Sequence, residues 1–369
     1  MSEIIELYRK DDERSSIIKV AAVNENREEL SSGRFVFLDT SYSNTKIKTM
    51  LAGGIGTPVH NRRGGNVRKI FDYMHAKATE EDVAVALLHP FSYAYYRMFG
   101  YEKVSDHLIV RFPTRLVDFV PRRCKFVPYD ESKYSDLVKI YDKFSVGRNL
   151  LLPRNDPKYY LNDKRTVYIC YDGEEPIAYI IYSSTQKLVV NHLAEGLLTV
   201  HEIAYTSPEA LREIFSFLRM FEGEFDDIEF SNIAMCPEVE LLLRHYTHTT
   251  YTRVPDIMAR VINTEKLLAA KTYPEQEGEF TVRVDDILPK AAGVYKVCYG
   301  GGNSKVIRLN DGADSDITLS SGAFSRLVYG YDGIDENAAL YMDGVTVNKK
   351  CTDFFRAFPK APCGAFEHF

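Results

Sequence analysis

Two strand-like runs dominate the pattern of apolar and polar residues near the start of the chain. Residues 34–42 and 48–58 are rich in β-branched, aromatic and other apolar residues, and a polar turn at 43–44 separates them. From Val67 the apolar residues recur at i, i+3, i+4 and i+7, which predicts an amphipathic helix. The apolar run 83–90 then predicts a short buried strand.

A short helix over 93–98, stopped by Gly100, is expected next. The order strand, helix, strand, helix predicts a βαβ-type unit. A similar order follows Cys124, with a helix over 131–144, two strands within 166–182, and a strand followed by a helix within 197–221. Pro208 suits the first position of that last helix.

A third segment begins after a polar stretch, 269–280, that contains proline and glycine and reads as a linker. Residues 281–369 alternate short strands with glycine turns, and 321–330 is their best candidate helix. The chain has 369 residues, which favours two or three domains.

Charge and composition exclude several classes of protein. The net charge of −6 argues against nucleic acid as the main partner, since phosphate binding needs a basic field. No apolar run is long enough for a transmembrane helix, and the charged first residues do not resemble a signal peptide. Six cysteines without a CxxC pair indicate a reduced, cytoplasmic protein without a metal site.

The stretch "GGIGTPVHNRRGG", residues 53–65, carries the candidate chemistry. A glycine loop that leads into a helix N-terminus can bind an anion through free N–H groups, and adjacent arginines add charge. The string is neither a Walker A loop nor a GxGxxG fingerprint. The alternative is a glycine-rich turn whose two arginines are solvated.

The surrounding residues resemble the GNAT N-acetyltransferases. The loop signature of that family falls on Asn61 to Asn66, although its first and last positions depart from the family pattern, and "YYRMFGYE" follows at the expected distance. The segments "TPVHNRRGG", "LLHPFSYAYYRMFGYE", "LTVHEIAYTSPEALREIFSFL" and "APCGAFEHF" together resemble the Eis (enhanced intracellular survival) family over essentially the whole chain.

The Eis resemblance implies an α/β (α+β) fold with two GNAT-type domains followed by a sterol-carrier-protein-like domain. We expect an acetyl-CoA-binding GNAT domain at 1–125, a degenerate GNAT domain at 126–275, and the third domain, with its tail entering the active site, at 276–369. It also implies a homo-oligomer, a hexamer, that acetylates aminoglycoside, polyamine or lysine-type amines, without nucleic acid, membrane or metal as a partner. The alternatives are a non-catalytic acyl-CoA-binding or sensing protein and lipid carriage by the third domain.

The resemblance also places the family's site residues on this chain. The general acid is expected at Tyr96, with the neighbouring Tyr95 as its competitor, and Tyr93, Tyr95 and Tyr101 are expected to be packing residues. The base, or the group that orients the amine, is expected to be the terminal carboxylate of Phe369. The residues expected to bind the cofactor acetyl-CoA are Gly54, Ile55, Gly56, Arg62, Arg63, Gly64, Gly65, Asn66, Val67, Phe91 and Ser92.

Acids that line the acceptor pocket are not placed by any motif. Glu367 and Asp353 are candidates because they lie close to the end of the sequence, while other acids such as Asp39 are equally expected to be solvated.

Overall fold

The computed structural model describes residues 2–118, 121–154, 157, 160–162, 164–188, 194–243 and 247–369. These residues form three β-sheets with helices packed on them, an α+β fold. The chain divides into two compact units, the first comprising residues 1–105, 256–363 and 368–369, and the second 106–255 and 364–367.

The first sheet belongs to the first unit and has the order β1-β2-β3-β4-β5-β14-β6. Its strands are β1 (Glu3–Asp12), β2 (Ser15–Val23), β3 (Glu29–Tyr42), β4 (Thr45–Gly56), β5 (Val85–Leu88), β14 (Met258–Val261) and β6 (Glu102–Lys103). The connecting helices are η1 (Val59–Asn61), α1 (Asn66–Glu80) and α2 (Tyr93–Arg97). The strands and helices predicted over 34–98 are all confirmed.

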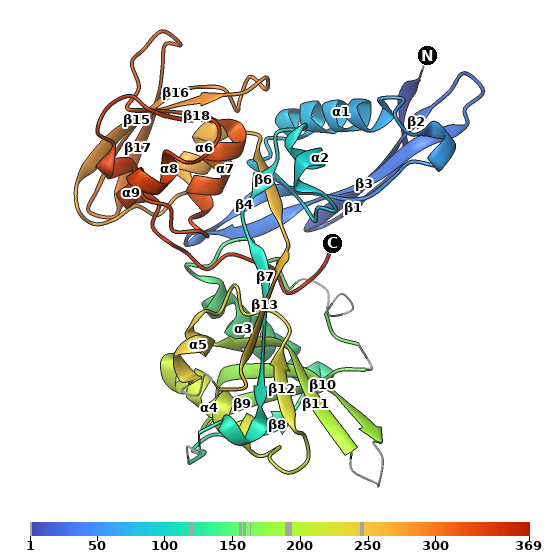
Figure 1. Ribbon diagram of the computed structural model, residues 1–369, viewed down its shortest axis with the longest axis vertical. Helices are drawn as coiled ribbons and strands as arrows, with labels where there is room; N and C mark the ends of the chain where they lie inside the picture. The colour runs from blue at the N-terminus through green and yellow to red at the C-terminus, as the bar shows by residue number, and fades with distance from the viewer. Residues whose placement is uncertain are drawn as a thin grey trace. The chain divides into compact units, whose positions relative to one another are not determined.

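Helix α1 lies along the long strands of this sheet (Figure 1). Its predicted apolar face is buried, with Ile70, Phe71 and Met74 each 0% exposed. Phe71 packs edge-on against Phe35 of β3, with ring centroids 6.3 Å apart. The i, i+3, i+4 spacing therefore builds the core that supports the loop before the helix.

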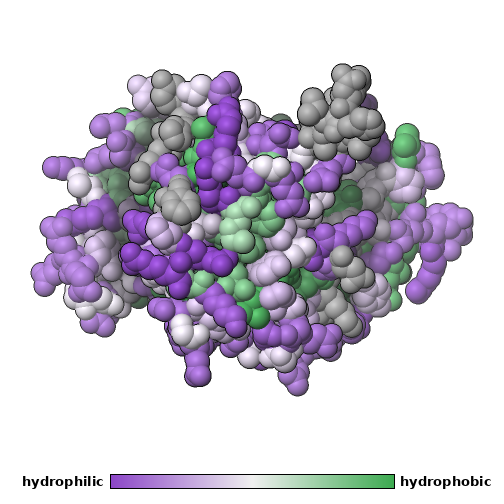
Figure 2. Space-filling model, turned by 90° about the horizontal axis from the view of Figure 1, so that it is seen from below, coloured by the Kyte–Doolittle hydropathy of each residue, from purple (hydrophilic) through white to green (hydrophobic). Residues whose placement is uncertain are grey.

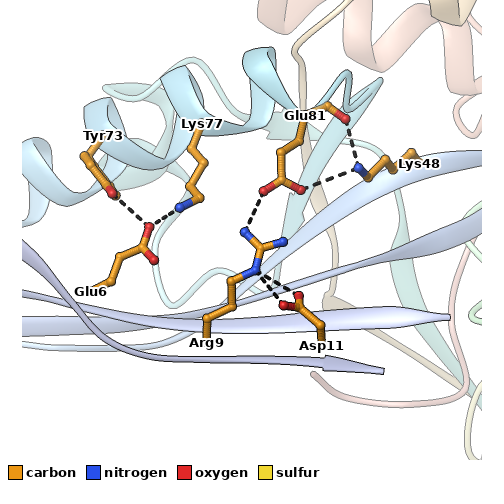
Figure 3. A network of polar contacts seen from close by, with 7 residues as sticks. All are labelled: Glu6, Arg9, Asp11, Lys48, Tyr73, Lys77 and Glu81. Atoms are coloured by element: carbon orange, nitrogen blue, oxygen red, sulfur yellow. Dashed lines mark hydrogen bonds and ion pairs between the residues drawn. The ribbon is translucent and has the colours of Figure 1, made fainter. Parts of the chain in front are cut away.

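Strand β1 was not predicted, because charged residues are mixed with its few apolar ones and end in the run Arg9–Asp12. Ion pairs and hydrogen bonds join this edge strand to α1, as Figure 3 shows. Glu6 accepts a hydrogen bond from the Tyr73 hydroxyl at 2.9 Å and pairs with Lys77, and Arg9 pairs with Glu81 at 3.0 Å. A polar edge strand of this kind also discourages pairing with another chain.

The second sheet belongs to the second unit and has the order β13-β7-β12-β11-β10-β9-β8. Its strands are β13 (Thr250–Pro255), β7 (Asp106–Pro113), β12 (Asp227–Phe230), β11 (Ala194–Tyr205), β10 (Glu175–Leu188), β9 (Thr166–Asp172) and β8 (Lys125–Pro128). Helices η2 (Thr114–Leu116), η3 (Glu131–Lys133), α3 (Tyr134–Ser145), α4 (Pro208–Arg219) and α5 (Glu238–Leu242) accompany it. Pro208 stands at the first helical position, as predicted.

Two strands pair outside the sequence segments proposed for their domains. Strand β7 lies within 1–125 but pairs with β12 and β13 in the second sheet. Strand β14 lies within 126–275 but pairs with β5 and β6 in the first sheet. The boundaries at 125 and 275 remain predictions. Neither strand carries a sequence signal that identifies the sheet in which it pairs.

The third sheet belongs to the first unit and has the order β17-β16-β15-β18-β19. Its strands are β17 (Asn303–Leu309), β16 (Gly293–Gly300), β15 (Gly278–Asp285), β18 (Ile317–Ser320) and β19 (Val345–Val347), with helices α6 (Thr264–Ala269), α7 (Ser321–Tyr329), α8 (Glu336–Ala339) and α9 (Thr352–Ala357). Helix α7 confirms the prediction for 321–330.

Hydrophilic residues cover most of the face seen in Figure 2, and apolar residues form smaller patches on it. Within the described parts of the chain, no helix is both long and apolar enough to cross a membrane.

Candidate active site

The first glycines of the loop belong to a β-bulge at the end of β4. Gly53 pairs with Arg34 and Gly56 pairs with Ser32, so residues 54 and 55 stand opposite a single residue of β3. Gly54 has a φ of 59°, a backbone conformation that residues other than glycine adopt only with strain. The bulge ends the regular strand before the helix begins.

The last glycine of the loop starts α1. Gly65, with a φ of 74°, is the N-cap residue, and as a glycine it has no side chain that could accept a hydrogen bond from the first amides of the helix. A Cβ added at Gly65 would meet no atom of the described residues within 4 Å. Uncapped N–H groups, the positive end of the helix dipole and the exposed Arg62 and Arg63 together make an anion-binding surface.

A cavity of about 860 Å³ lies beside this helix start. Its lining includes eight of the residues predicted to bind the cofactor, namely Ile55, Arg62, Arg63, Gly64, Gly65, Asn66, Val67 and Phe91. Gly54, Gly56 and Ser92, also predicted, are not among the lining residues. Arg68 lines the cavity although the sequence analysis stopped at Val67; it donates to the Met98 carbonyl at 3.1 Å.

Strands β4 and β5 separate after their last paired residues. They are parallel and paired through Ala52 and Leu88, and the next residues are Gly53 and His89. The carbonyl carbon of Phe369 lies 3.4 Å from the position of a Cβ on Gly53, and the Phe369 ring lies 4.3 Å from the His89 ring. The structure thus brings the main chain of Phe369 to the point where the two strands separate.

A histidine and an aspartate that the sequence analysis did not single out also meet there. His89 Nδ1 lies 3.0 Å from Asp256 Oδ1, and the two side chains are 8% and 6% exposed. Asp256 reaches this place because β14, which begins two residues after it, pairs with β5. More than 160 residues separate the partners in sequence, and no spacing rule detects such a pair.

The two candidate tyrosines have different surroundings. Tyr95 lines the cavity, whereas Tyr96 is not among the lining residues and is 5% exposed in the core beneath. Burial, together with a smaller contribution from the nearby Tyr95, raises the pKa of Tyr96 to about 12. Tyr96 lies against Phe91 and Phe71, with ring centroids 5.3 Å and 6.2 Å apart. Of the predicted packing tyrosines, Tyr101 is 1% exposed and shares a hydrogen bond with His75.

The segment before Phe369 is held in the second unit. The Asn232 amide donates to the Ala365 carbonyl at 3.2 Å, and the Phe366 ring lies 6.3 Å from that of Phe144. Glu367 pairs with Arg154, yet burial raises the pKa of this carboxyl above its usual value.

Arg154 is the centre of a buried cluster in the second unit. Its guanidinium pairs with Glu202 at 2.7 Å and lies between the rings of Tyr141 and Tyr160, at 4.1 and 4.3 Å. Asp353, the other candidate pocket acid, instead accepts a hydrogen bond from the Glu279 amide at 3.0 Å and pairs with Arg356. Both acids therefore hold structural partners.

The helix of the second unit that corresponds in order to α1 begins differently. At the start of α4 the Ser207 hydroxyl accepts from the Ala210 amide at 3.1 Å, and Pro208 has no N–H. The side chain of Ser207 therefore uses one of the first N–H groups of α4, and Pro208 removes another. Few free N–H groups are left there to bind an external anion.

Comparison with known proteins agrees with this geometry. Residues 6–104 and 150–261 match two family models, each described as an acetyltransferase (GNAT) domain. A search of curated proteins found no match.

Several solved structures share the fold. A GCN5-related N-acetyltransferase from Anabaena variabilis matches with a TM-score of 0.80 and 16% identity, over 95% of this chain and 89% of that one. Eis1 from Mycobacterium abscessus matches with a TM-score of 0.77 and 17% identity, over 97% and 92%. A GCN5-related N-acetyltransferase from Kribbella flavida matches with a TM-score of 0.77 and 15% identity, over 95% and 87%.

Proposed function

This chain is a GNAT acetyltransferase with two GNAT domains, and we propose on that basis that its first domain transfers the acetyl group of acetyl-CoA to a primary amine. One observation carries the proposal above the rest. The uncapped N-terminus of α1 and two exposed arginines stand on the wall of a cavity of about 860 Å³. An acyl-CoA co-substrate offers a pyrophosphate that fits such a site.

The cofactor site is the predicted set, which comprises Gly54 to Gly56, Arg62 to Val67, Phe91 and Ser92. Main-chain amides at Gly64 to Val67 would hold the pyrophosphate, and Arg62 and Arg63 would add charge-assisted hydrogen bonds. Arg68, also on the cavity wall, extends the same positive surface.

Tyr96 is proposed to stabilise the leaving sulfur with a hydrogen bond. An ordinary thiol has a pKa of about 8.5, and burial raises that of Tyr96 to about 12, so complete proton transfer to the sulfur would cost about 5 kcal/mol. A hydrogen bond to the developing thiolate avoids that cost. Tyr95, on the cavity wall, is the competing donor.

Phe369 is proposed to orient the amine through its main-chain carboxylate beside Gly53. An ordinary α-carboxyl has a pKa of about 3.5, far below that of an alkyl ammonium, so binding and orienting the ammonium suits it better than accepting its proton. The role requires that the protein end at Phe369, which intact mass spectrometry tests directly.

The finer assignment to the Eis family, and with it a hexamer in the cytoplasm and a sterol-carrier-like third domain, also belongs to the proposal. The match to Eis1 supports the shared fold, and the six free cysteines fit a reducing compartment. Light scattering of the purified protein tests the hexamer.

The deciding experiment is thioester consumption with free thiol as the readout, against aminoglycosides, polyamines and lysine peptides. Amine-dependent release of CoA at a steady rate supports the proposal. A protein that binds acetyl-CoA but releases no thiol with any amine of the panel would instead be a non-catalytic acyl-CoA-binding or sensing protein.

A C-terminal extension tests Phe369 separately. One added residue moves the carboxylate by about 3.3–3.6 Å, and misplacement on that scale costs about 100-fold in rate. An N-terminal extension is the control. A folded, C-terminally extended protein with normal kcat/KM for the amine would remove Phe369 from the site.

A further inference from the structure

The proposed site still lacks a group that suits proton transfer from the amine. When the new amide bond forms, the amine nitrogen must lose a proton, and an ordinary α-carboxylate is a weak base for that step. An ordinary imidazole, with a pKa of about 6.5, is a stronger base by about a factor of 1000.

His89 supplies an imidazole beside Phe369, and its two nitrogens have different environments. Nδ1 lies 3.0 Å from Asp256 Oδ1. Nε2 is buried and has no hydrogen-bond partner among the residues that the structure describes, and the same holds for Asp256 Oδ2. A buried polar atom without a partner is uncommon and calls for an explanation.

The pairing with Asp256 selects the tautomer. A carboxylate accepts the proton of Nδ1, so the lone pair of a neutral imidazole stays on Nε2. The same carboxylate stabilises the imidazolium once Nε2 has taken a proton. This is the orientation that a general base requires from a histidine and its carboxylate partner.

The ring is also fixed in place at the parting of β4 and β5. The His368 ring stacks on it with centroids 4.0 Å apart and an angle of 15°, and the Phe369 ring contacts it at 4.3 Å. His89 therefore adjoins the residue whose carboxylate is proposed to orient the amine. Among the described residues, the titratable groups on the residues that contact it are those of Asp256, His368 and the chain end at Phe369.

We propose that His89, oriented by Asp256, is the general base of the acetyl transfer, an inference that rests on the proposed function. The amine nitrogen bonds to the acetyl carbon, the carbon–sulfur bond breaks, and the sulfur keeps its electron pair. One nitrogen proton passes to Nε2 of His89 and from there to solvent, and the thiolate takes a proton from solvent. Phe369 orients the amine, while His89 accepts the proton.

The test compares His89→Asn, which keeps a donor toward Asp256 but lacks Nε2, with Asp256→Asn and a control, His107→Gln on β7. CoA release is measured as kcat/KM for the amine across pH. His89→Asn should lose about 100- to 1000-fold, and the fall in rate at low pH should disappear with it. Asp256→Asn should lose less, and His107→Gln should match the wild type.

Thermal unfolding of each variant separates a lost base from a lost fold. If His89→Asn does not fold, the Asp256→Asn variant carries the test, because its low-pH fall in rate should move. A folded His89→Asn variant with a wild-type rate and pH profile overturns the role of His89 alone. If no amine of the panel stimulates CoA release by the wild-type protein, the proposed function is overturned and, with it, this role.

Discussion

The two GNAT domains begin their central helices in opposite ways. In the first, Gly65 precedes α1 with no side-chain cap, and exposed arginines surround the start. In the second, Ser207 caps α4 and Pro208 removes an N–H. The same fold thus offers an external anion free amides at one helix and satisfied ones at the other.

The two units also differ in their buried polar clusters, which are His89 with Asp256 in the first and Arg154 with its partners in the second. In the first unit, His89 Nε2 and Asp256 Oδ2 have no hydrogen-bond partner among the described residues. In the second unit, Arg154 is buried between two carboxylates and two tyrosine rings. The Glu367 oxygens of that cluster also have no hydrogen-bond partner among the described residues, so the two clusters differ in their charges: the second contains a buried arginine that pairs with both carboxylates, and the first contains a histidine and one carboxylate.

The largest expected effect therefore belongs to the second domain and concerns stability. Arg154→Met leaves Glu202 and Glu367 buried without their cation, which should cost about 3–5 kcal/mol in the free energy of unfolding. Urea denaturation followed by circular dichroism measures the loss. At temperatures where the variant is folded, the KM for acetyl-CoA should not change; a loss below about 1 kcal/mol would contradict a structural cluster.

The tyrosine pair tests the chemistry of the first domain. Tyr96→Phe should lower kcat about 100-fold and leave acetyl-CoA affinity nearly unchanged, because only the hydrogen bond to the sulfur is lost. Tyr95→Phe is the matched control and should do far less. The reverse result would assign the role to Tyr95, the tyrosine on the cavity wall.

The arginines test the anion site directly. Arg62→Ala/Arg63→Ala should raise the KM for acetyl-CoA ten- to a hundredfold, since two charge-assisted contacts of about 1.5 kcal/mol each are lost. Stability should hold, because both side chains are exposed. Arg122→Ala/Arg123→Ala, another adjacent exposed pair, is the control, and an unchanged KM in the first pair would move the cofactor elsewhere.

The two helix starts can be compared by matched single changes. Ser207→Ala should cost about 1 kcal/mol of stability by removing a cap, with no change in KM. Gly65→Ala should cost about 1 kcal/mol because its φ is 74°, and should also raise the KM for acetyl-CoA. Equal KM values in the two variants would mean that the start of α1 holds no anion.

Sequence reasoning found much of this arrangement and missed parts for physical reasons. The glycine–arginine loop and α1 are local, and their spacing predicted both. Strand β1 was missed because contacts with α1, not an apolar pattern, hold its charged residues. The His89–Asp256 pair depends on β14 crossing into the first sheet from a distant part of the chain, which no local pattern encodes.

The smallest expected effect concerns β1, the charged edge strand of the first sheet. The hydrogen bond from Lys77 lowers the pKa of Glu6 in the folded state. The contribution is therefore present above the ordinary carboxyl pKa of about 4.3 and is lost as the pH falls through the lowered value. Because the network is partly exposed, Glu6→Gln should cost only about 0.5 kcal/mol at neutral pH.

Hydrogen-exchange mass spectrometry can locate so small a change. Faster exchange should appear in β1 and α1, and the second unit should keep its wild-type protection, because Glu6 contacts Tyr73 and Lys77 of α1. Glu3→Gln on the same strand is the control. Near pH 3 the wild type and Glu6→Gln should exchange more nearly alike, since the carboxylate is then increasingly protonated. A difference that stayed as large at low pH would mean that shape, not charge, holds β1 to the helix.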